Sequence, residues 1–204
     1  MAPPSQTSTQ HDVDTRERLL SAGAELFVQK GFHGCGLSEV LRHAGVPKGS
    51  FYHWFGSKED FGIALIERTR DEYMDLLKPV LSDRKVSPMK RLRAAFELGR
   101  AHADSEQSTD VCLVTKLGLE TANLSESVHA AVKCVYQQWN ALLAQLIREA
   151  QATGEIAPEQ DADRLAGVLV MLWEGATIRT QIERDDRALD DFLDLVFDRL
   201  LRRD

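Results

Sequence analysis

The stretch GLSEVLRHAGVPKGSFYHWF, residues 36–55, predicts two short helices joined by a tight turn. In residues 36–44 the apolar side chains recur every three or four positions, as they do on one face of a helix. Gly45 lets the chain change direction without a side-chain clash, and Pro47 fixes the backbone where the next helix begins. This spacing is that of a helix-turn-helix, whose second helix enters the major groove of DNA.

The second of these helices, residues 48–55, carries different side chains on its two faces. Phe51 and Phe55 lie four residues apart and are expected to anchor the helix to the core. Gly49 in its first turn permits close approach of the backbone to DNA, and Ser50 can bond a base edge or a phosphate. The candidate DNA contacts on this helix are Lys48, Gly49, Ser50, Tyr52 and His53.

The distribution of charge favours a nucleic-acid site here, although the net charge of the chain, −7, does not. Residues 1–70 contain eight Lys and Arg against eight Asp and Glu, so the net negative charge lies further along the chain. Residues 36–58 carry three basic side chains against one acidic one, with two histidines beside them. Lys58 ends this stretch at the start of another helix, where its charge and the free backbone N–H groups favour a phosphate.

The rest of the chain also predicts helices, because apolar residues recur at helical spacing and no alternation typical of strands is found. The fold class is all-α, with about nine helices. The expected helices cover residues 15–30, 36–44, 48–55, 58–81, 88–104, 111–121, 125–153, 161–183 and the C-terminal stretch that follows Asp186. The expected domains are a disordered tail over 1–14, a DNA-binding domain over 15–57 and a ligand-sensing and dimerisation domain over 58–204.

Residues 31–32, 37–40, 44–55 and 57–59 (GF, LSEV, AGVPKGSFYHWF and SKE) closely resemble the N-terminal domain of the tetracycline-repressor (TetR) family. The resemblance covers about residues 15–65. It implies a three-helix head that binds operator DNA, and C-terminal helices that dimerise and enclose an inducer pocket. It places DNA contacts at Gly36, Ser38, Lys48, Gly49, Ser50, Tyr52, His53 and Lys58.

Two positions depart from the pattern of that family. Cys35 and Gly36 stand where the family usually has Thr or Ser, so the hydroxyl contact to phosphate is lost and only the Gly36 N–H remains to make one. Trp54 replaces the usual Tyr or His, which puts its phosphate contact in doubt.

Five short stretches further along resemble one branch of the family, which includes the repressor of N-ethylmaleimide reductase and the acrylate-responsive repressor. They are residues 48–53, 61–64, 112–114, 124–126 and 173–176. In that branch a cysteine at the position of Cys112 is the reactive sensor, which implies release of DNA by an electrophile or oxidant. Gln181 stands where the branch has a lysine, so a cysteine–lysine crosslink is not expected here.

The residues around Cys112 are compatible with a reactive thiol. Cys112 follows a polar stretch and is expected near a helix N-terminus, where the helix dipole stabilises a thiolate. Lys116, one turn further along, adds positive charge that favours a thiolate, whereas the negative charge of Asp110 disfavours one. Two alternatives remain: a reversible ligand without thiol chemistry, and a buried inert thiol. Trp173 is expected to line a pocket or to belong to the plain core, and Glu174 to be paired, to line a polar cavity or to lie at the dimer interface.

The last two helices are expected to form a dimer interface of four helices, two from each subunit. Their apolar residues recur at helical spacing, and the alternative is that they only close the core of one subunit. A dimer is favoured because one short recognition helix binds DNA weakly and a palindrome needs two. The candidate interface residues are Leu165, Val168, Leu169, Leu172, Leu189, Phe192, Leu193, Val196 and Leu200.

Several other classes of protein are disfavoured by composition. Three widely spaced cysteines argue against a disulfide framework, and no spacing typical of a metal site occurs, so we expect no metal and no cofactor. Cys35 and Cys134 are interpreted as structural. No apolar run reaches membrane-spanning length and no signal peptide is recognised, so we expect a cytoplasmic protein without a membrane partner. An enzyme using Cys112 with His102 or His129 has no supporting acid pair or cofactor motif.

Overall fold

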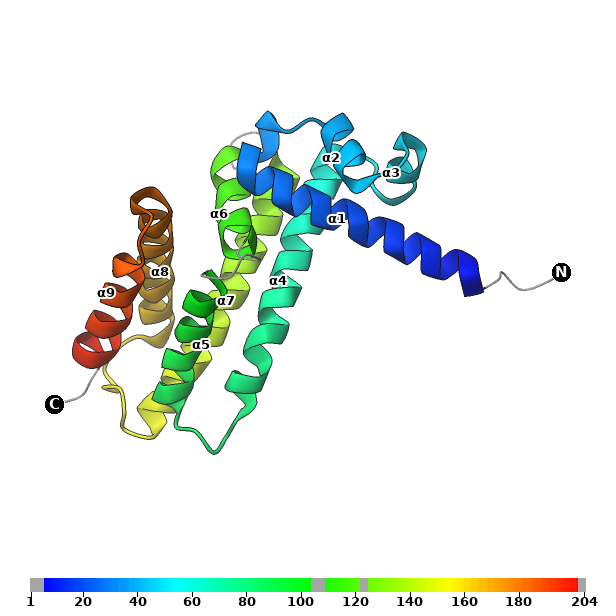
Figure 1. The fold of residues 1–204 in the computed structure, drawn as a ribbon. Coiled ribbons are helices and arrows are strands. Elements are labelled where there is room, and N and C mark those ends of the chain that lie inside the picture. The colour runs from blue at the N-terminus through cyan, green and yellow to red at the C-terminus, as the bar shows by residue number, and fades with distance from the viewer. Residues whose placement is uncertain (1–5, 104–108, 122–124, 202–204) are drawn as a thin grey trace. The chain divides into compact units, whose positions relative to one another are not determined.

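The computed structural model describes residues 6–103, 109–121 and 125–201, and of residues 6–13, 102–103 and 109–112 it describes the backbone only. Over these residues the chain forms nine α-helices and one short π-helix, and no strand (Figure 1). Their bounds are α1 Gln6–Gly34, α2 Leu37–Ala44, α3 Lys48–Trp54, α4 Lys58–Ser82, α5 Pro88–Ala103, α6 Thr109–Thr121, α7 Glu126–Ala152, α8 Ala162–Glu183, α9 Arg187–Leu195 and the π-helix Val196–Leu200. The predicted all-α class is confirmed.

The chain divides into two compact units that do not follow the predicted boundary at residue 57. Unit 1 contains Met1–Thr69 together with Leu113–Val132, and unit 2 contains Arg70–Cys112 together with Lys133–Asp204. Most of α6, which the sequence analysis assigned to the sensing domain, thus belongs to the unit that carries the helix-turn-helix. Helices α4, α6 and α7 each run from one unit into the other.

Unit 1 is organised around a cluster of phenylalanine rings. Phe61 of α4 lies 5.8 Å from Phe27, 5.4 Å from Phe51 and 4.9 Å from Phe55, measured between ring centroids. A side chain at Gly23 of α1 would overlap the Phe61 ring, so this glycine allows α1 and α4 to pack closely. The cluster joins α1, α3 and α4, and it holds α3 against the other two helices.

Two glycines end or bend the helices of unit 1: Gly45 ends α2 as predicted, whereas the prediction that Gly31 ends the first helix is wrong. Gly45 adopts a left-handed conformation (φ 63°, ψ 37°) and its N–H bonds the carbonyls at the end of α2. Gly31 has φ 78° and ψ 167° and kinks α1 rather than ending it, so the helix continues to Gly34. Both conformations favour glycine because a side chain would be strained there.

Unit 2 packs α8 and α9 together and closes them over α5 and α7. Phe96 of α5 is central, because its ring lies 5.3 Å from Trp173 of α8, 4.9 Å from Phe192 of α9 and 5.9 Å from Phe197. Arg91, only 3% exposed, ties the α4–α5 connection to α7 by donating to the carbonyl of Leu81 and to the carboxylate of Glu149.

One expectation about the N-terminus is corrected. Residues 6–14, predicted as part of a disordered tail, belong to α1, because no glycine or proline interrupts the chain after Pro4 to stop the helix. Residues 1–5 lie outside the described part of the chain. Over the residues that are described, no helix is long and apolar enough to cross a membrane.

Candidate DNA-binding site and sensor cavity

Helix α3 presents one buried and one exposed face. Phe51 is fully buried, whereas Lys48, Gly49 and His53 are exposed and Tyr52 is 52% exposed. Ser50 is half-buried. The ammonium of Lys48 lies 6.0 Å from the centre of the Tyr52 ring, so both side chains occupy the same outer surface. The structure thus brings five of the predicted DNA contacts together on one short helix.

Helix α2, which precedes the turn, is fixed to α1 by polar contacts. Arg18 donates to the carbonyl of Ala44 at 2.7 Å, and His43 Nε2 lies 2.8 Å from the carboxylate of Glu25. Lys30 pairs with Glu39 and holds the pKa of that carboxyl below its usual range through their hydrogen bond. Because Glu39, the acidic residue of this stretch, is engaged in this way, its charge is largely compensated.

Two glycines of the predicted DNA surface, Gly36 and Gly49, are not required by the structure of the subunit itself. A side chain at Gly36 or at Gly49 would meet nothing within 4 Å, and both residues have negative φ. Neither packing nor backbone strain therefore requires glycine at these two positions. Ser38, in the first turn of α2, is exposed near Gly36. Trp54 is half-buried at the end of α3.

Lys58 occupies a different place from the one expected of a phosphate contact. Its ammonium donates to the carbonyl of Phe32 and lies 4.5 Å from the centre of the Phe32 ring. Burial lowers the pKa of Lys58 from its ordinary value. The turn at residues 56–57 brings the start of α4 onto the end of α1, which directs this side chain inward.

Helix α6 supplies two further contacts to the end of α1. Lys116 donates to the carbonyl of Val28, and the carboxylate of Glu120 accepts from the N–H of His33 at 3.1 Å, across the kink at Gly31. Lys116 was predicted to lie beside Cys112 and favour a thiolate, but its ammonium is engaged with α1 instead. Sequence reasoning missed Glu120, because the kink that leaves the His33 N–H free appears only in the fold.

The three cysteines differ in environment. Cys35 is fully buried and burial raises the pKa of its thiol, so it is unreactive and fits the structural interpretation. Cys134 is exposed on α7, where Gln138 donates to its sulfur, and its interpretation as structural stays a prediction. Cys112 lies in the first turn of α6, as expected, but its side chain is outside the described part, as is that of His102.

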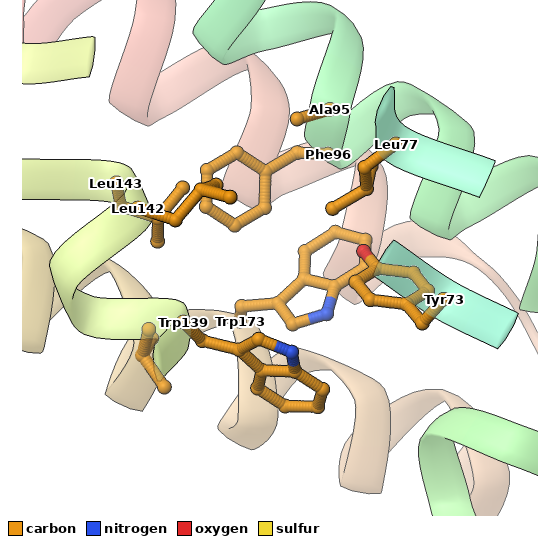
Figure 2. A pocket seen from close by; sticks show the side chains of 9 residues that line it. Tyr73, Leu77, Ala95, Phe96, Trp139, Leu142, Leu143 and Trp173 are labelled. Carbon is orange, nitrogen blue, oxygen red and sulfur yellow. The ribbon is translucent and has the colours of Figure 1, made fainter. Parts of the chain in front are cut away.

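Unit 2 contains a small apolar cavity of about 40 Å³. Trp173, expected to line a pocket or to be plain core, does both, since it is buried against Phe96 and also borders the cavity. Figure 2 shows Tyr73, Trp139 and Trp173 converging on this space from α4, α7 and α8. The lining residues are Tyr73, Leu77, Ala95, Phe96, Trp139, Leu142, Leu143, Val170 and Trp173.

The sequence predicted only some of the functional candidates of unit 2, and neither Glu174 nor Gln181 lines the cavity. Glu174 is half-buried, burial raises the pKa of its carboxyl, and Tyr136 hydrogen-bonds to it. Gln181 is exposed near the end of α8 and does not border the cavity. The sequence analysis missed Tyr73 and Trp139, because each lies on a helix that also supplies many core residues and neither belongs to a motif.

The candidate interface residues separate into two groups. Leu169, Leu189, Phe192, Leu193 and Val196 are buried in the core of unit 2 itself. Val168, Leu172 and Leu200 are exposed, and Leu165 is partly buried against that core. The exposed members continue along α8 with three more large apolar side chains, which are Met171, Ile178 and Ile182.

Known families match both parts of this arrangement. The sequence model described as "Bacterial regulatory proteins, tetR family" matches residues 19–65, which include the helix-turn-helix, and "Tetracyclin repressor-like, C-terminal domain" matches residues 88–196. The chain belongs to the TetR family. Its identification by resemblance to this family is confirmed.

Relatives of this TetR-family protein cover most of its length. The transcriptional regulator AcuR of Cereibacter sphaeroides is 39% identical over 167 residues, which span 82% of this chain and 76% of AcuR. The transcriptional repressor NemR of Escherichia coli (strain K12) is 36% identical over 185 residues, 91% of this chain and 92% of NemR. The crystal structure of reduced E. coli NemR has a TM-score of 0.83 at 34% identity, with 93% of this chain and 97% of that one covered.

Proposed function

We propose that this TetR-family regulator is a homodimeric repressor, which binds a pseudo-palindromic operator and leaves it when a small molecule or an electrophile reaches unit 2. The observation that carries the proposal is the outer face of α3. Lys48, Tyr52 and His53 are exposed there over the buried Phe51, and Gly49 leaves the backbone open to close approach. These features fit a helix that lies in a major groove.

Operator binding is tested with the purified protein and the DNA upstream of its own gene. Fluorescence anisotropy would compare this DNA with a shuffled duplex of equal length and composition over a range of salt concentrations. We expect at least about a thousandfold preference for the upstream DNA at physiological salt. Equal binding of both duplexes at every salt concentration would contradict the proposal.

The dimer is supported by a row of exposed apolar side chains on α8. Met171 is 63% exposed, Ile178 38% and Ile182 75%, and they recur at the spacing of one helix face, with Leu172, 44% exposed, at its edge. Gly167 and Gly175 belong to the same helix, and a side chain at either would meet nothing within 4 Å. Glycine inside a helix costs about 1 kcal/mol relative to alanine, so close approach of a second copy gives these glycines a reason.

Two kinds of inducer are compatible with unit 2. A thiol sensor is supported by the position of Cys112 in the first turn of α6 and by the resemblance to the electrophile-sensing branch. A reversible ligand is supported by the apolar cavity between α4, α5, α7 and α8. In either case, α4 continues from the cavity into the unit that carries α3, so a shift of α4 would change the spacing of the two recognition helices.

The two kinds of inducer are separated by treating the protein with N-ethylmaleimide or hypochlorite and measuring operator release. Cys112→Ser is compared with Cys134→Ser, because Cys134 is the exposed competitor. We expect wild type and Cys134→Ser to release DNA and Cys112→Ser to retain it. If Cys112→Ser releases DNA as readily as wild type, Cys112 is not the sensor and the reversible ligand is the better account.

A further inference from the structure

The cavity of unit 2 is walled almost entirely by carbon. Four of the residues that border it, Tyr73, Phe96, Trp139 and Trp173, are aromatic and the other five are aliphatic, and none carries a charge. At about 40 Å³ it admits only a small body, of a few non-hydrogen atoms. Gly99 keeps the space open, since a side chain there would lie 2.9 Å from the Trp173 ring and 2.9 Å from the Tyr73 hydroxyl oxygen.

One polar group of this wall has no partner within the protein. The indole Nε1 of Trp139 is buried and makes no hydrogen bond to any described residue. The Trp139 ring packs edge-to-face against the Tyr73 ring, with centroids 5.6 Å apart (Figure 2), and against the Tyr136 ring, with centroids 5.8 Å apart, so neighbouring rings on α4 and α7 hold its orientation. Leaving a buried donor unpaired costs about 1–3 kcal/mol, which a ligand with an acceptor atom would recover.

The charge of the ligand follows from the same wall. An anion would be buried here without a basic partner, which is costly. A cation would find aromatic faces, but the positive end of the Trp139 N–H dipole lies in the same wall and repels it. Burial raises the pKa of Tyr73 to about 12, so its hydroxyl stays neutral and adds a second potential donor.

We propose that this cavity binds a small uncharged compound with an apolar body and an acceptor oxygen, such as a ketone or aldehyde, whose oxygen accepts from Trp139 Nε1. The proposal rests on the proposed role of unit 2 as the sensor and names the chemical class of its reversible ligand. It does not require reaction with a thiol.

The experiment uses the full-length protein without DNA and probes that cannot alkylate cysteine. Ligand-observed NMR titrations would compare propanone with three other small molecules that fit the size of the cavity: propane without an acceptor, acetate as an anion and methylammonium as a cation. We expect propanone to bind more tightly than either ion. We also expect it, but not propane, to shift the indole N–H resonance of Trp139 downfield, because only the ketone accepts a hydrogen bond.

Trp139→Phe keeps an aromatic ring and removes the donor. We expect it to weaken propanone binding about fivefold and to leave propane binding unchanged, as the loss of one neutral hydrogen bond predicts. Trp54→Phe, in the DNA-binding unit, is the matched control and should change neither affinity. Gly99→Ala should abolish binding of both probes by pushing Trp173 and Tyr73 into the cavity.

Four results would overturn the proposal: no binding of propanone to wild type, tighter binding of either ion, equal losses for ketone and alkane in Trp139→Phe, or an unmoved Trp139 resonance at saturation. The resonance is measured on wild type, so the test holds even if Trp139→Phe does not fold. DNA is absent throughout, so failure here leaves operator binding and thiol sensing to be tested separately.

Discussion

The two units differ in how completely they satisfy their own polar groups. Among the described residues of unit 1, every buried side-chain nitrogen and oxygen has a hydrogen-bond partner. Unit 2 leaves Trp139 Nε1, Asn140 Oδ1, Glu174 Oε1 and Thr180 Oγ1 buried without one. Buried polar groups are normally paired, so their concentration in one unit fits the proposal that a ligand or a second copy completes unit 2.

The same contrast appears in the glycines that packing does not require. In unit 1 these are Gly36 and Gly49, which lie on the outer surface of the helix-turn-helix. In unit 2 they are Gly167 and Gly175 on α8, the helix with the exposed apolar row. In the described part of unit 1 the buried polar side-chain atoms are therefore paired, and the glycines without a packing role lie on the surface of the helix-turn-helix. In unit 2 several buried polar atoms lack a partner, and α8 has an exposed apolar face.

The largest expected effect comes from charging the exposed apolar face of α8. Leu172→Asp places a carboxylate at the edge of this face, where it would be buried against the second copy. We expect sedimentation to show a monomer and operator affinity to fall about a hundredfold or more, because two recognition helices no longer bind together.

Leu119→Asp is the control, since Leu119 is 75% exposed in unit 1 and should tolerate the charge. Leu193 and Val196 are unsuitable for this test, because both are buried in the subunit core and a charge there would unfold it. A monomeric Leu172→Asp protein that still binds the full operator as tightly as wild type would show that dimerisation is not required.

The second prediction concerns a hydrogen-bonded cluster of unit 2, formed by Arg84, Arg91 and Glu149. Arg84 and Arg91 hydrogen-bond to Glu149 and hold the pKa of its carboxyl at about 2. A carboxyl whose pKa is lowered on folding stabilises the protein above the unfolded pKa, near 4.5, and loses this contribution as the pH falls toward 2. We therefore expect Glu149→Gln to lower the free energy of unfolding by about 2 kcal/mol at pH 7 and by much less at pH 3.

Urea unfolding at both pH values measures this difference. Glu97→Gln is the control, because Glu97 pairs with Arg93 at the surface, where such pairs contribute about 0–1 kcal/mol. If Glu149→Gln lowers the free energy of unfolding by the same amount at pH 7 and at pH 3, the carboxylate charge contributes little to stability. Packing alone would then hold the α4–α5 connection to α7.

The contrast between the units also explains what the sequence could predict. The helix-turn-helix is encoded locally: Gly45, Pro47 and the Phe51–Phe55 pair set helix ends and buried faces within twenty residues, and the structure reproduces them. The division of the apolar residues of α8 and α9 into core and surface could not be read from spacing. Leu169 and Leu172 share a periodicity, and only the packing of α5 and α7 decides which one is covered.

The contacts of Lys58 and Lys116 lay beyond prediction for a related reason. Each side chain reaches a carbonyl on a segment far away in the sequence, which becomes available only where α1 kinks and ends. The cavity depends in the same way on four helices at once. Local signals identified the helix-turn-helix, whereas the cavity of unit 2 needed the tertiary structure.

The third prediction tests whether the open glycines of unit 1 serve DNA. Gly49→Ala adds one methyl group that meets no protein atom, and alanine favours helix, so the stability should stay level or rise by up to about 1 kcal/mol. Operator affinity should nevertheless fall about tenfold, or 1.4 kcal/mol, because the methyl keeps α3 from the groove. Thermal unfolding and anisotropy measured together check both parts.

Gly34→Ala is its control, since Gly34 is also exposed and its added methyl would make only an ordinary 3.8 Å contact within the subunit. Equal operator affinity of Gly49→Ala and wild type would place the backbone of α3 away from the DNA. Close approach to DNA would then not explain the glycine at position 49.

The smallest expected effect distinguishes Lys48 from Lys58, both of which were predicted from the sequence to contact DNA. Lys48 is exposed on α3, whereas the ammonium of Lys58 bonds the Phe32 carbonyl and lies against its ring. If Lys48 neutralises a phosphate, Lys48→Met lowers the slope of log K against log salt by about one for each phosphate that Lys48 contacts. It should leave the free energy of unfolding unchanged. We expect Lys58→Met to do the reverse: to lower the free energy of unfolding by about 1 kcal/mol and keep the slope, because it removes a bond at the end of α1. A reduced slope in Lys58→Met would show that this ammonium leaves the carbonyl to contact a phosphate, so that an interior group of unit 1 also takes part in binding DNA.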